Sequence, residues 1–484
     1  MLESLREERL KKLTLLKSKG IDPYPARSVR TLAIHEVRKH FKEFAKLKKK
    51  VVVAGRIIGL RDQGSVVFID LRDESGEVQG VLKRDNLKEA FELWKSALDR
   101  GDFMSVSGVP FMTKRGEQSI EVKSLTILTK SLLPIPTEFY GLKDKETLLR
   151  KRYLDFVAHP ELRELFKKKS VFWKSTRAYL EEHGFLEVET PILENVPGGA
   201  EAEPFVTHYS ALDRAVYLRI SPELPLKRLM VAGFEKVFEI GRIFRNEGID
   251  AEHLQDYTQM EMYWAYQDYE RLMKFVEAMI KKVIKETFGT LTLTHQERNI
   301  HWGKKWQRYD YGKLFYEATK IDPAKAEKGK LLKIAREKGI EQATEMFRKG
   351  RLIDLIYKKT VRPKLIEPGF LVNPPVMVEP LAKRMPSDPE RVERFQLVAC
   401  GTELGKGFSE LNDPLDQRVR FEEQMKLRAE GDKEAQLLDE YFIEALEYGM
   451  PPTAGFGMSE RFFAVLVDRP VREVVLFPLT RSRE

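Results

Sequence analysis

The stretch Lys236–Glu261, KVFEIGRIFRNEGIDAEHLQDYTQME, predicts two strands joined by a charged loop and is the most informative segment of the chain. From Lys236 to Phe244 the side chains alternate with a period of two, which places one face of a strand in a core. The loop RNEG, residues 245–248, interrupts this alternation. The return strand carries Tyr257, Gln259, Glu261 and Tyr263 along one face. A purely structural sheet would place Val or Ile there, so the hairpin predicts a binding site.

The loop combines an anion-binding group with an amine-binding group. The forked guanidinium of Arg245 suits bidentate contact with a phosphate or a carboxylate, and Glu247 can accept from an amine. An anion site beside an amine site suggests a nucleotide. The alternative is an exposed hairpin with solvated charges, and a lone RNEG would favour that alternative.

Two further segments support the binding site. RAYLEEHGFLEVETPILENVPGGAEAEPF, residues 177–205, predicts a helix that Gly184 ends and a short strand, Phe185–Pro191, that proline stops. YLRISPELPLKRLM, residues 217–230, predicts a strand followed by a helix that begins near Glu223.

The third supporting segment is AGFGMSERFFAVLVDRPVREVVLFPLTR, residues 454–481. Gly455 and Gly457 allow the backbone to approach a ligand closely. Arg461 lies in the first turn of an apolar helix, Phe462–Val467, and is aimed at the same gap.

These segments together resemble the three signature motifs of class II aminoacyl-tRNA synthetases. Strings typical of the lysine-specific family within that class follow in its order and spacing: FLEVETP, PGGA, KRLM, VFEIGR, FRNEG, GFSELNDP and LFPL. The resemblance runs from about Val51 to Thr480. It implies ATP-dependent attachment of L-lysine to tRNA(Lys) through a lysyl-adenylate, by a cytoplasmic homodimer with Phe185–Pro191 at its interface.

Composition agrees with this resemblance. A net charge of +9 and a pI near 9.1 favour an anionic partner such as nucleic acid. The one cysteine, Cys400, excludes a disulfide within the chain and fits a reducing compartment. The start of the sequence predicts a charged amphipathic helix without the apolar segment of a signal peptide, and no apolar run is long enough to span a bilayer.

The sequence predicts an α+β protein in four parts: an N-terminal helical extension (1–50), an OB-fold barrel (51–133), a linker (134–150) and a catalytic domain (151–484). The catalytic domain should contain an antiparallel sheet, because neither a phosphate-loop GKS/T nor a GxGxxG is present. The lysine-rich stretch 265–364 predicts a helical insertion, and the sequence does not indicate its function.

Five strand candidates and one helix, Leu87–Leu98, predict the OB-fold, which offers one face to single-stranded nucleic acid. In the resembled family this barrel binds the anticodon. By position, Phe68 stacks on a base, Gln79 and Glu117 bond to base edges, and Arg61 contacts base or phosphate. The structural alternative is that Phe68 fills the barrel.

The resemblance assigns the ATP site residue by residue. Arg245 bridges the substrate carboxylate and the α-phosphate, and Arg461 holds the γ-phosphate, so these two are the catalytic pair. Glu247 and His253 contact the adenosine and its phosphates, and Tyr257 stacks on adenine. Mg²⁺ is held by Glu403.

For the amino acid, the resemblance assigns a pocket with carboxylates at its far end: Gly199, Ser221, Glu223, Glu261, Tyr263, Lys406 and Glu410. Burying several carboxylates is costly unless a cation accompanies them, so the cluster implies a cationic ligand or an internal Lys or Arg partner. Lysine fits the first option, and Lys406 raises the second.

Lys406 is the main departure from the family, which commonly has asparagine there. An ammonium about 6 Å from the substrate ammonium would cost roughly 3 kcal/mol at an effective dielectric near 20. An ammonium facing the substrate carboxylate would instead tighten binding, and the sequence leaves both orientations open. Further departures are Ser221 for alanine, Pro225 for tyrosine, Glu460 for aspartate, and Gln396 for a second metal-binding glutamate.

Three functions therefore stay open. The first is lysine–tRNA ligation. The second keeps adenylation but changes the amino acid or the acceptor, as in a paralogue that attaches β-lysine to an elongation factor. The third is a catalytically silent tRNA-binding protein that uses only the barrel.

Overall fold

The computed structural model describes residues 2–136, 144–248, 253–345, 347–429 and 435–480. These form two compact units, Met1–Lys143 and Asp144–Glu484. Most of the predicted linker, residues 137–143, lies outside the described residues.

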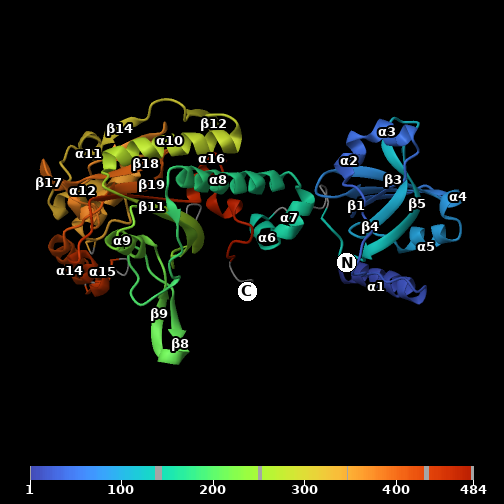
Figure 1. The fold of residues 1–484 in the computed structure, drawn as a ribbon, viewed down its shortest axis with the longest axis horizontal. Coiled ribbons are helices and arrows are strands. Elements are labelled where there is room, and N and C mark those ends of the chain that lie inside the picture. Colours follow the sequence, from blue (N-terminus) through green and yellow to red (C-terminus); the bar gives the residue numbers. More distant parts are fainter. Residues whose placement is uncertain (1, 137–143, 249–252, 346, 430–434, 481–484) are drawn as a thin grey trace. The chain divides into compact units, whose positions relative to one another are not determined.

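The first unit contains the predicted five-stranded barrel (Figure 1). Its strands are β1 (Val51–Asp62), β2 (Val66–Arg72), β3 (Glu77–Lys83), β4 (Phe103–Met112) and β5 (Gln118–Thr129), closed in the order β1-β2-β3-β5-β4. The predicted helix is present as α4 (Arg84–Leu87) and α5 (Ala90–Ala97). Alternate residues of β2, Val67, Ile69 and Leu71, fill the interior. The OB-fold prediction is confirmed.

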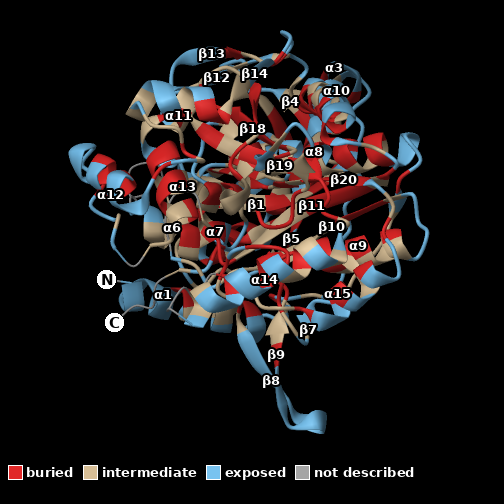
Figure 2. Cartoon of the chain, turned by 90° about the vertical axis from the view of Figure 1, so that its left-hand side faces the viewer, coloured by how far each residue is buried: buried red, intermediate tan, exposed pale blue. Residues whose placement is uncertain are grey.

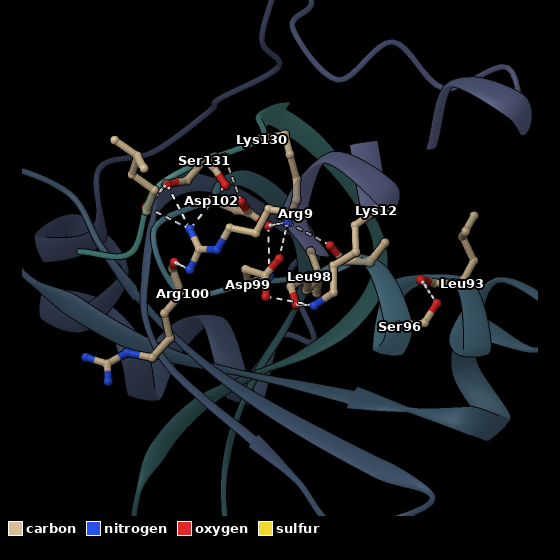
Figure 3. A network of polar contacts seen from close by, with 12 residues as sticks. Arg9, Lys12, Leu93, Ser96, Leu98, Asp99, Arg100, Asp102, Lys130 and Ser131 are labelled. Atoms are coloured by element: carbon tan, nitrogen blue, oxygen red, sulfur yellow. Dashed lines mark hydrogen bonds and ion pairs between the residues drawn. The ribbon is translucent and has the colours of Figure 1, made fainter. Parts of the chain in front are cut away.

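The N-terminal extension belongs to the same unit as the barrel. Its helices are α1 (Leu2–Ser18), α2 (Ile34–Lys39) and α3 (Phe41–Lys46), and Leu16, Ile34 and Phe44 join the barrel core. Arg9 donates to the backbone oxygens of Ser131, Leu133 and Arg100 at 3.1, 2.8 and 2.9 Å (Figure 3). Residues 1–50, predicted as a helical extension, thus pack on the barrel within one compact unit.

The second unit is built on an eight-stranded sheet in the order β14-β15-β18-β19-β20-β11-β10-β6. Figure 2 shows β18, β19, β20, β11 and β10 side by side. The strands are β6 (Leu186–Glu187), β10 (Lys236–Phe244), β11 (Asp256–Ala265), β14 (Gln307–Asp310), β15 (Gly369–Val372), β18 (Arg394–Ala399), β19 (Thr402–Ser409) and β20 (Thr453–Ser459). Neighbours pair antiparallel except β14 with β15 and β10 with β6. The predicted antiparallel sheet is thus confirmed, with parallel pairs at both edges.

One face of this sheet packs in the main core, and the other face carries polar side chains. Met260 and Met262 of β11 pack in the main core with Phe456 and Met458 of β20. The helices α8 (Leu162–Glu182) and α10 (Tyr269–Phe288) contribute to the same core. Because side chains alternate along a strand, the polar residues of β11 project from the other face. This is why the return strand of the hairpin is both buried and polar.

Helix ends follow the sequence signals. Gly184 ends α8 just before β6 with a φ of 80°, a backbone conformation that glycine adopts without strain. The predicted strand Phe185–Pro191 shrinks to the two residues of β6, because only Leu186 and Glu187 pair with β10. The helix α9 (Glu223–Val231) begins where expected, and Pro225 stands in its first turn, where no intrahelical N–H bond is required.

The stretch 265–364 differs from the helical insertion that we predicted. After α10 come three strands, β12 (Thr292–His295), β13 (Arg298–His301) and β14, and then α11 (Tyr311–Thr319), α12 (Lys328–Glu337) and α13 (Lys349–Thr360). β14 joins the main sheet, and α10 lies in the main core. Short strands with few apolar residues gave no period-two signal, so the sequence pattern concealed them.

Among the described residues, no helix has the length and apolar character needed to cross a membrane.

The remaining helices and strands of the second unit are α6 (Lys145–Arg150), α7 (Arg152–Ala158), β7 (Leu193–Glu194), β8 (Val206–Tyr209), β9 (Arg214–Leu218), β16 (Arg384–Met385), β17 (Asp388–Val392), α14 (Pro414–Ala429), α15 (Glu440–Glu447) and α16 (Arg461–Leu466). The β8–β9 hairpin projects from the body of this unit, and β8 is exposed along its whole length (Figures 1 and 2).

Candidate active site

A cavity of about 830 Å³ opens on the polar face of the sheet. Its wall includes all of the residues that the sequence assigned to the ATP and amino-acid sites: Gly199, Ser221, Glu223, Arg245, Glu247, His253, Tyr257, Glu261, Tyr263, Glu403, Lys406, Glu410 and Arg461. They come from β11, β19, α9, α16 and the loops between the elements. Residues as far apart in the chain as Gly199 and Arg461 therefore share one pocket.

Arg245 directly follows β10 and is fixed at both its backbone and its side chain. Its backbone N–H donates to the carbonyl of Gln255 at 2.8 Å, and its Nε donates to the carbonyl of Ile220 at 3.2 Å. The guanidinium lies over the ring of Tyr257, 5.6 Å from the centroid. These contacts hold a cation and an aromatic ring together in the cavity wall, as an anionic ligand with a planar base requires.

The other predicted ATP residues lie around this pair. Nε2 of His253 is 3.9 Å from Oε2 of Glu247, which makes an ion pair when the imidazole is protonated. Arg461 is the first residue of α16, as the sequence predicted, and its backbone N–H donates to Oγ of Ser459 at 3.4 Å. Glu460, the departure beside it, accepts from the backbone N–H of Thr258 at 3.1 Å and pairs with Lys169. Glu460 thus ties the start of α16 to β11.

Three carboxylates meet in the same cavity, and an internal lysine lies among them. Nζ of Lys227 is 2.7 Å from Oε1 of Glu223 and also pairs with Glu410. Lys227 is fully buried. The sequence left open an internal Lys or Arg partner and named Lys406 for it; the structure places Lys227 there instead. Lys227 lies one turn after Glu223 in the predicted helix, and this spacing could have indicated the ion pair from the sequence.

Glu261 receives neutral donors. Ser221 Oγ donates to its Oε1 at 2.7 Å, Tyr263 OH donates to its Oε2 at 2.9 Å, and Gln259 also donates. Ser221 accepts in turn from the backbone N–H of Glu223 at 3.2 Å. The serine that replaces the usual alanine therefore orients one carboxylate of the cluster.

Burial changes the proton affinities in this cluster. Burial, with the neighbouring charge of Glu223, raises the pKa of Glu261 to about 7. Burial also raises the pKa of Glu410 well above its ordinary value, although Lys227 opposes this. Burial lowers the pKa of Lys227, but Glu223 and Glu410 outweigh it and raise the pKa overall. One lysine thus leaves a surplus of acid in the pocket, which a cationic ligand would neutralise.

Lys406 has a partner outside this cluster. Its Nζ lies 3.0 Å from Oε2 of Glu379, a buried residue of the cavity wall. Nε of Arg394 lies 3.3 Å from the same oxygen. Burial raises the pKa of Glu379, but the two cations outweigh it and hold that pKa below its ordinary value.

The predicted metal ligand has an amide neighbour. Nε2 of Gln396 donates to Oε2 of Glu403 at 2.7 Å. No group of three or more His, Cys, Asp or Glu that could bind a metal occurs among the described residues. Mg²⁺ is commonly held by one or two carboxylates together with phosphate oxygens and water, so Glu403 fits an ion that a nucleotide brings with it.

The helix α13 brings cavity residues that sequence reasoning missed. Arg351, Asp354 and Lys358 line the cavity, and Nζ of Lys358 is 2.7 Å from Oδ2 of Asp354. Their spacing of three and four residues places them on one helix face. That spacing was a readable signal, but the sequence pattern predicted only a lysine-rich helical insertion over residues 265–364.

In the barrel, the four predicted anticodon residues are partly or fully exposed. Phe68 of β2 is opposite Arg61 of β1, and Asp70 of β2 is opposite Gln79 of β3, so these side chains share the outer face. Arg61 makes two bonds to Asp70, at 2.7 and 3.0 Å, and Gln79 accepts from Ser119 at 3.0 Å. Phe68 does not fill the barrel; its neighbours Val67 and Ile69 do.

The antiparallel sheet with an arginine-bearing hairpin and a glycine-rich strand is the arrangement of a class II aminoacyl-tRNA synthetase, and here an OB-fold barrel precedes it in the chain. A family model described as "tRNA synthetases class II (D, K and N)" matches residues 144–481, and a model described as "OB-fold nucleic acid binding domain" matches residues 51–128. The chain belongs to the class II tRNA synthetases of the D, K and N group.

Similar proteins share the whole length of the chain. A lysine–tRNA ligase of Thermotoga maritima is 42% identical over 491 residues, which cover 100% of this chain and 97% of that protein. A lysine–tRNA ligase of Roseiflexus castenholzii is 43% identical over 488 residues, with 100% of both chains covered. A third, from Shouchella clausii, is 42% identical over 492 residues, covering 100% of this chain and 98% of that protein.

Proposed function

We propose that this protein is an aminoacyl-tRNA synthetase that attaches L-lysine to tRNA(Lys) in two steps, the first of which consumes ATP. The observation that carries the proposal is the acid cluster. Lys227 pairs with Glu223 and Glu410, whereas the donors to Glu261 are neutral side chains. The ionised cluster can therefore accept one further cation, and the ammonium of a lysine substrate supplies it. The full-length similarity to lysine–tRNA ligases supports the same conclusion.

In the first step, a carboxylate oxygen of lysine attacks the α-phosphorus of ATP, and diphosphate leaves. Two anions must approach each other, so fixed positive charge lowers the barrier. Arg245, held by Gln255 and Ile220, would bridge the carboxylate and the α-phosphate. Arg461 would hold the γ-phosphate, while Tyr257 stacks on adenine and Glu247 and His253 contact the nucleotide. No side chain acts as a covalent nucleophile.

Glu403 would hold Mg²⁺ in this site, with phosphate oxygens and water completing the shell. The chemistry that the bound ion supplies is neutralisation of phosphate charge. Gln396 donates to Glu403 and so orients its carboxylate. Of these two side chains, Glu403 is charged and Gln396 is not, so together they supply a single carboxylate. A single carboxylate fits a metal ion that enters the site with ATP.

In the second step, a ribose hydroxyl at the end of tRNA attacks the adenylate and releases AMP. Positioning dominates such a step. Phe68, Gln79, Arg61 and Glu117 would bind the anticodon on the outer face of the barrel. The partly exposed ring of Phe68 beside a guanidinium supports stacking on an unpaired base.

The protein would act in the cytoplasm as a homodimer. Leu186 lies in the segment Phe185–Pro191, Ile192 and Leu193 follow that segment directly, and all three are exposed. Val206 and Leu212 of the projecting hairpin are exposed as well. A second copy of the chain that covers these apolar side chains would explain their exposure. No observation favours another amino acid, another acceptor or a silent tRNA-binding role.

Aminoacylation of a tRNA(Lys) transcript with radiolabelled lysine tests this function. Replacing Arg245 with alanine should lower the rate by about 10²–10³, as for other groups that stabilise transition-state charge. Arg242→Ala is the matched control, because Arg242 lies on the preceding strand and projects from the opposite face. Equal activity of both variants would contradict the proposed role of Arg245.

A further inference from the structure

One row of residues crosses four strands of the sheet on the cavity side. Gln396 of β18 is opposite Lys406 of β19, Lys406 is opposite Gly457 of β20, and Gly457 is opposite Glu261 of β11. Directly opposed residues project from the same face of a sheet. Lys406 and Glu261 therefore point into one cavity, with a single residue between them.

That intervening residue has no side chain. A Cβ on Gly457 would lie 3.3 Å from Cγ of Glu261, so glycine leaves this side of the carboxylate open. Two strand spacings separate the backbones of Lys406 and Glu261 by about 10 Å, a gap that the long flexible stem of lysine and the side chain of glutamate can close together. The ammonium of Lys406 can therefore compete with a substrate ammonium for Glu261.

In the structure, the ammonium of Lys406 is paired with Glu379. Its Oε2 lies 3.0 Å from Nζ of Lys406 and 3.3 Å from Nε of Arg394. Glu379 is only 3% exposed, so solvent screens these pairs weakly. Two cations on one carboxylate hold it ionised, and that carboxylate holds the ammonium of Lys406 beside Glu379.

We propose that Glu379 is a positioning residue for substrate selection: it holds the ammonium of Lys406 away from Glu261, so that the acid cluster remains free for the ammonium of lysine. This inference rests on the proposed function. It also accounts for the departure at position 406, because an added cation in a lysine pocket is tolerated when a buried carboxylate restrains it.

The test is a double-mutant cycle in ATP–diphosphate exchange, with KM for lysine and kcat measured separately. Glu379→Gln keeps the shape of the side chain and removes its charge. It should raise KM for lysine about tenfold while kcat changes less than about threefold, since the released Lys406 competes with the substrate for binding. In a Lys406→Asn background the same change should alter KM less than about threefold, because no ammonium remains to compete.

Two controls separate this role from a structural one. Glu390→Gln makes the same chemical change at an exposed glutamate of β17 and should leave KM unchanged. If Glu379→Gln does not fold, Glu379→Asp replaces it, because aspartate keeps a charge for Arg394 but reaches less far toward Lys406. The expected result is the same: KM for lysine rises, and the rise is smaller in the Lys406→Asn background. Rescue by Lys406→Asn is a readout that a merely structural role of Glu379 would not give.

The outcomes are distinct. An unchanged KM in Glu379→Gln, or an equal rise in KM with and without the Lys406→Asn substitution, would overturn the inference while wild-type exchange with lysine continues. Absence of lysine-dependent exchange in the wild-type protein would overturn the proposed function itself, and this inference with it.

Discussion

Lys227 and Glu223 lie one turn apart on α9, with Nζ of the lysine 2.7 Å from Oε1 of the glutamate and both side chains buried. Glu410 reaches the same ammonium from the loop after β19. This fixed ion pair explains how three acids can meet in one pocket before the substrate arrives. It also leaves Glu261, bonded by neutral groups, as the carboxylate best suited to an incoming cation.

Replacing Lys227 with methionine should destabilise the protein by about 3–5 kcal/mol, because it leaves buried carboxylates without their cation. The free energy of unfolding in urea measures this effect. Lys282→Met is the matched control: Lys282 pairs with Glu182 at the surface, where solvent screens the pair and it contributes little to stability. Equal stability of the two variants would show that Lys227 does not compensate the buried acids.

Lysine should bind more tightly as the pH rises through about 7. With a pKa of about 7, Glu261 is mostly protonated at pH 6 in the ligand-free site and mostly ionised at pH 8. The substrate ammonium favours the ionised form, so Kd should fall about tenfold between these pH values and binding at pH 6 should release a proton. Calorimetry in two buffers of different ionisation enthalpy measures that proton. Glu261→Gln should weaken binding and flatten the pH dependence; a flat profile in the wild-type protein would contradict this role of Glu261.

Replacing Phe68 with alanine should weaken tRNA(Lys) binding and leave adenylation intact. A stacked base contributes about 1–3 kcal/mol, so Kd for tRNA should rise about 5- to 150-fold. Filter binding measures Kd, and ATP–diphosphate exchange without tRNA is the control in the same variant. A loss of exchange that parallels the loss of tRNA binding would show that Phe68 supports folding instead.

Leu193→Asp should weaken self-association. Leu193 is 55% exposed in the single chain, and a charge there would be desolvated in a dimer interface. Sedimentation velocity should show a dimer for the wild-type protein and a larger monomer fraction for the variant. Leu415→Asp changes an exposed leucine of α14 and is the control. A wild-type monomer would rule out the homodimer.

The sequence predicted the parts of the fold that depend on local patterns. Period-two alternation located β10 and β11 and, in the first unit, the strands of the barrel, while Gly184 located a helix end. The assignment of Phe68 to the outer face followed from the resemblance, and the register of β1, β2 and β3 agrees with it.

The remainder depends on pairing between distant segments, which local patterns do not encode. β14 has only four residues and joins the sheet through β15, which begins at Gly369. Glu379 follows the short turn Val376–Val378 and belongs to no motif recognised in the sequence. Its contact with Lys406 depends on the tertiary fold. Lys227 carried a helical spacing signal, but its burial depends on the packing of α9 against Glu410.

ATP–diphosphate exchange on the purified protein, in magnesium buffer, with each standard amino acid and β-lysine supplied in turn, is the sharpest test of the proposed function. We predict exchange with L-lysine and background rates with the others. Exchange with another amino acid, or with β-lysine in preference to lysine, would contradict the assigned substrate. Absence of exchange with any of them would contradict the assignment of this cavity as an adenylation site.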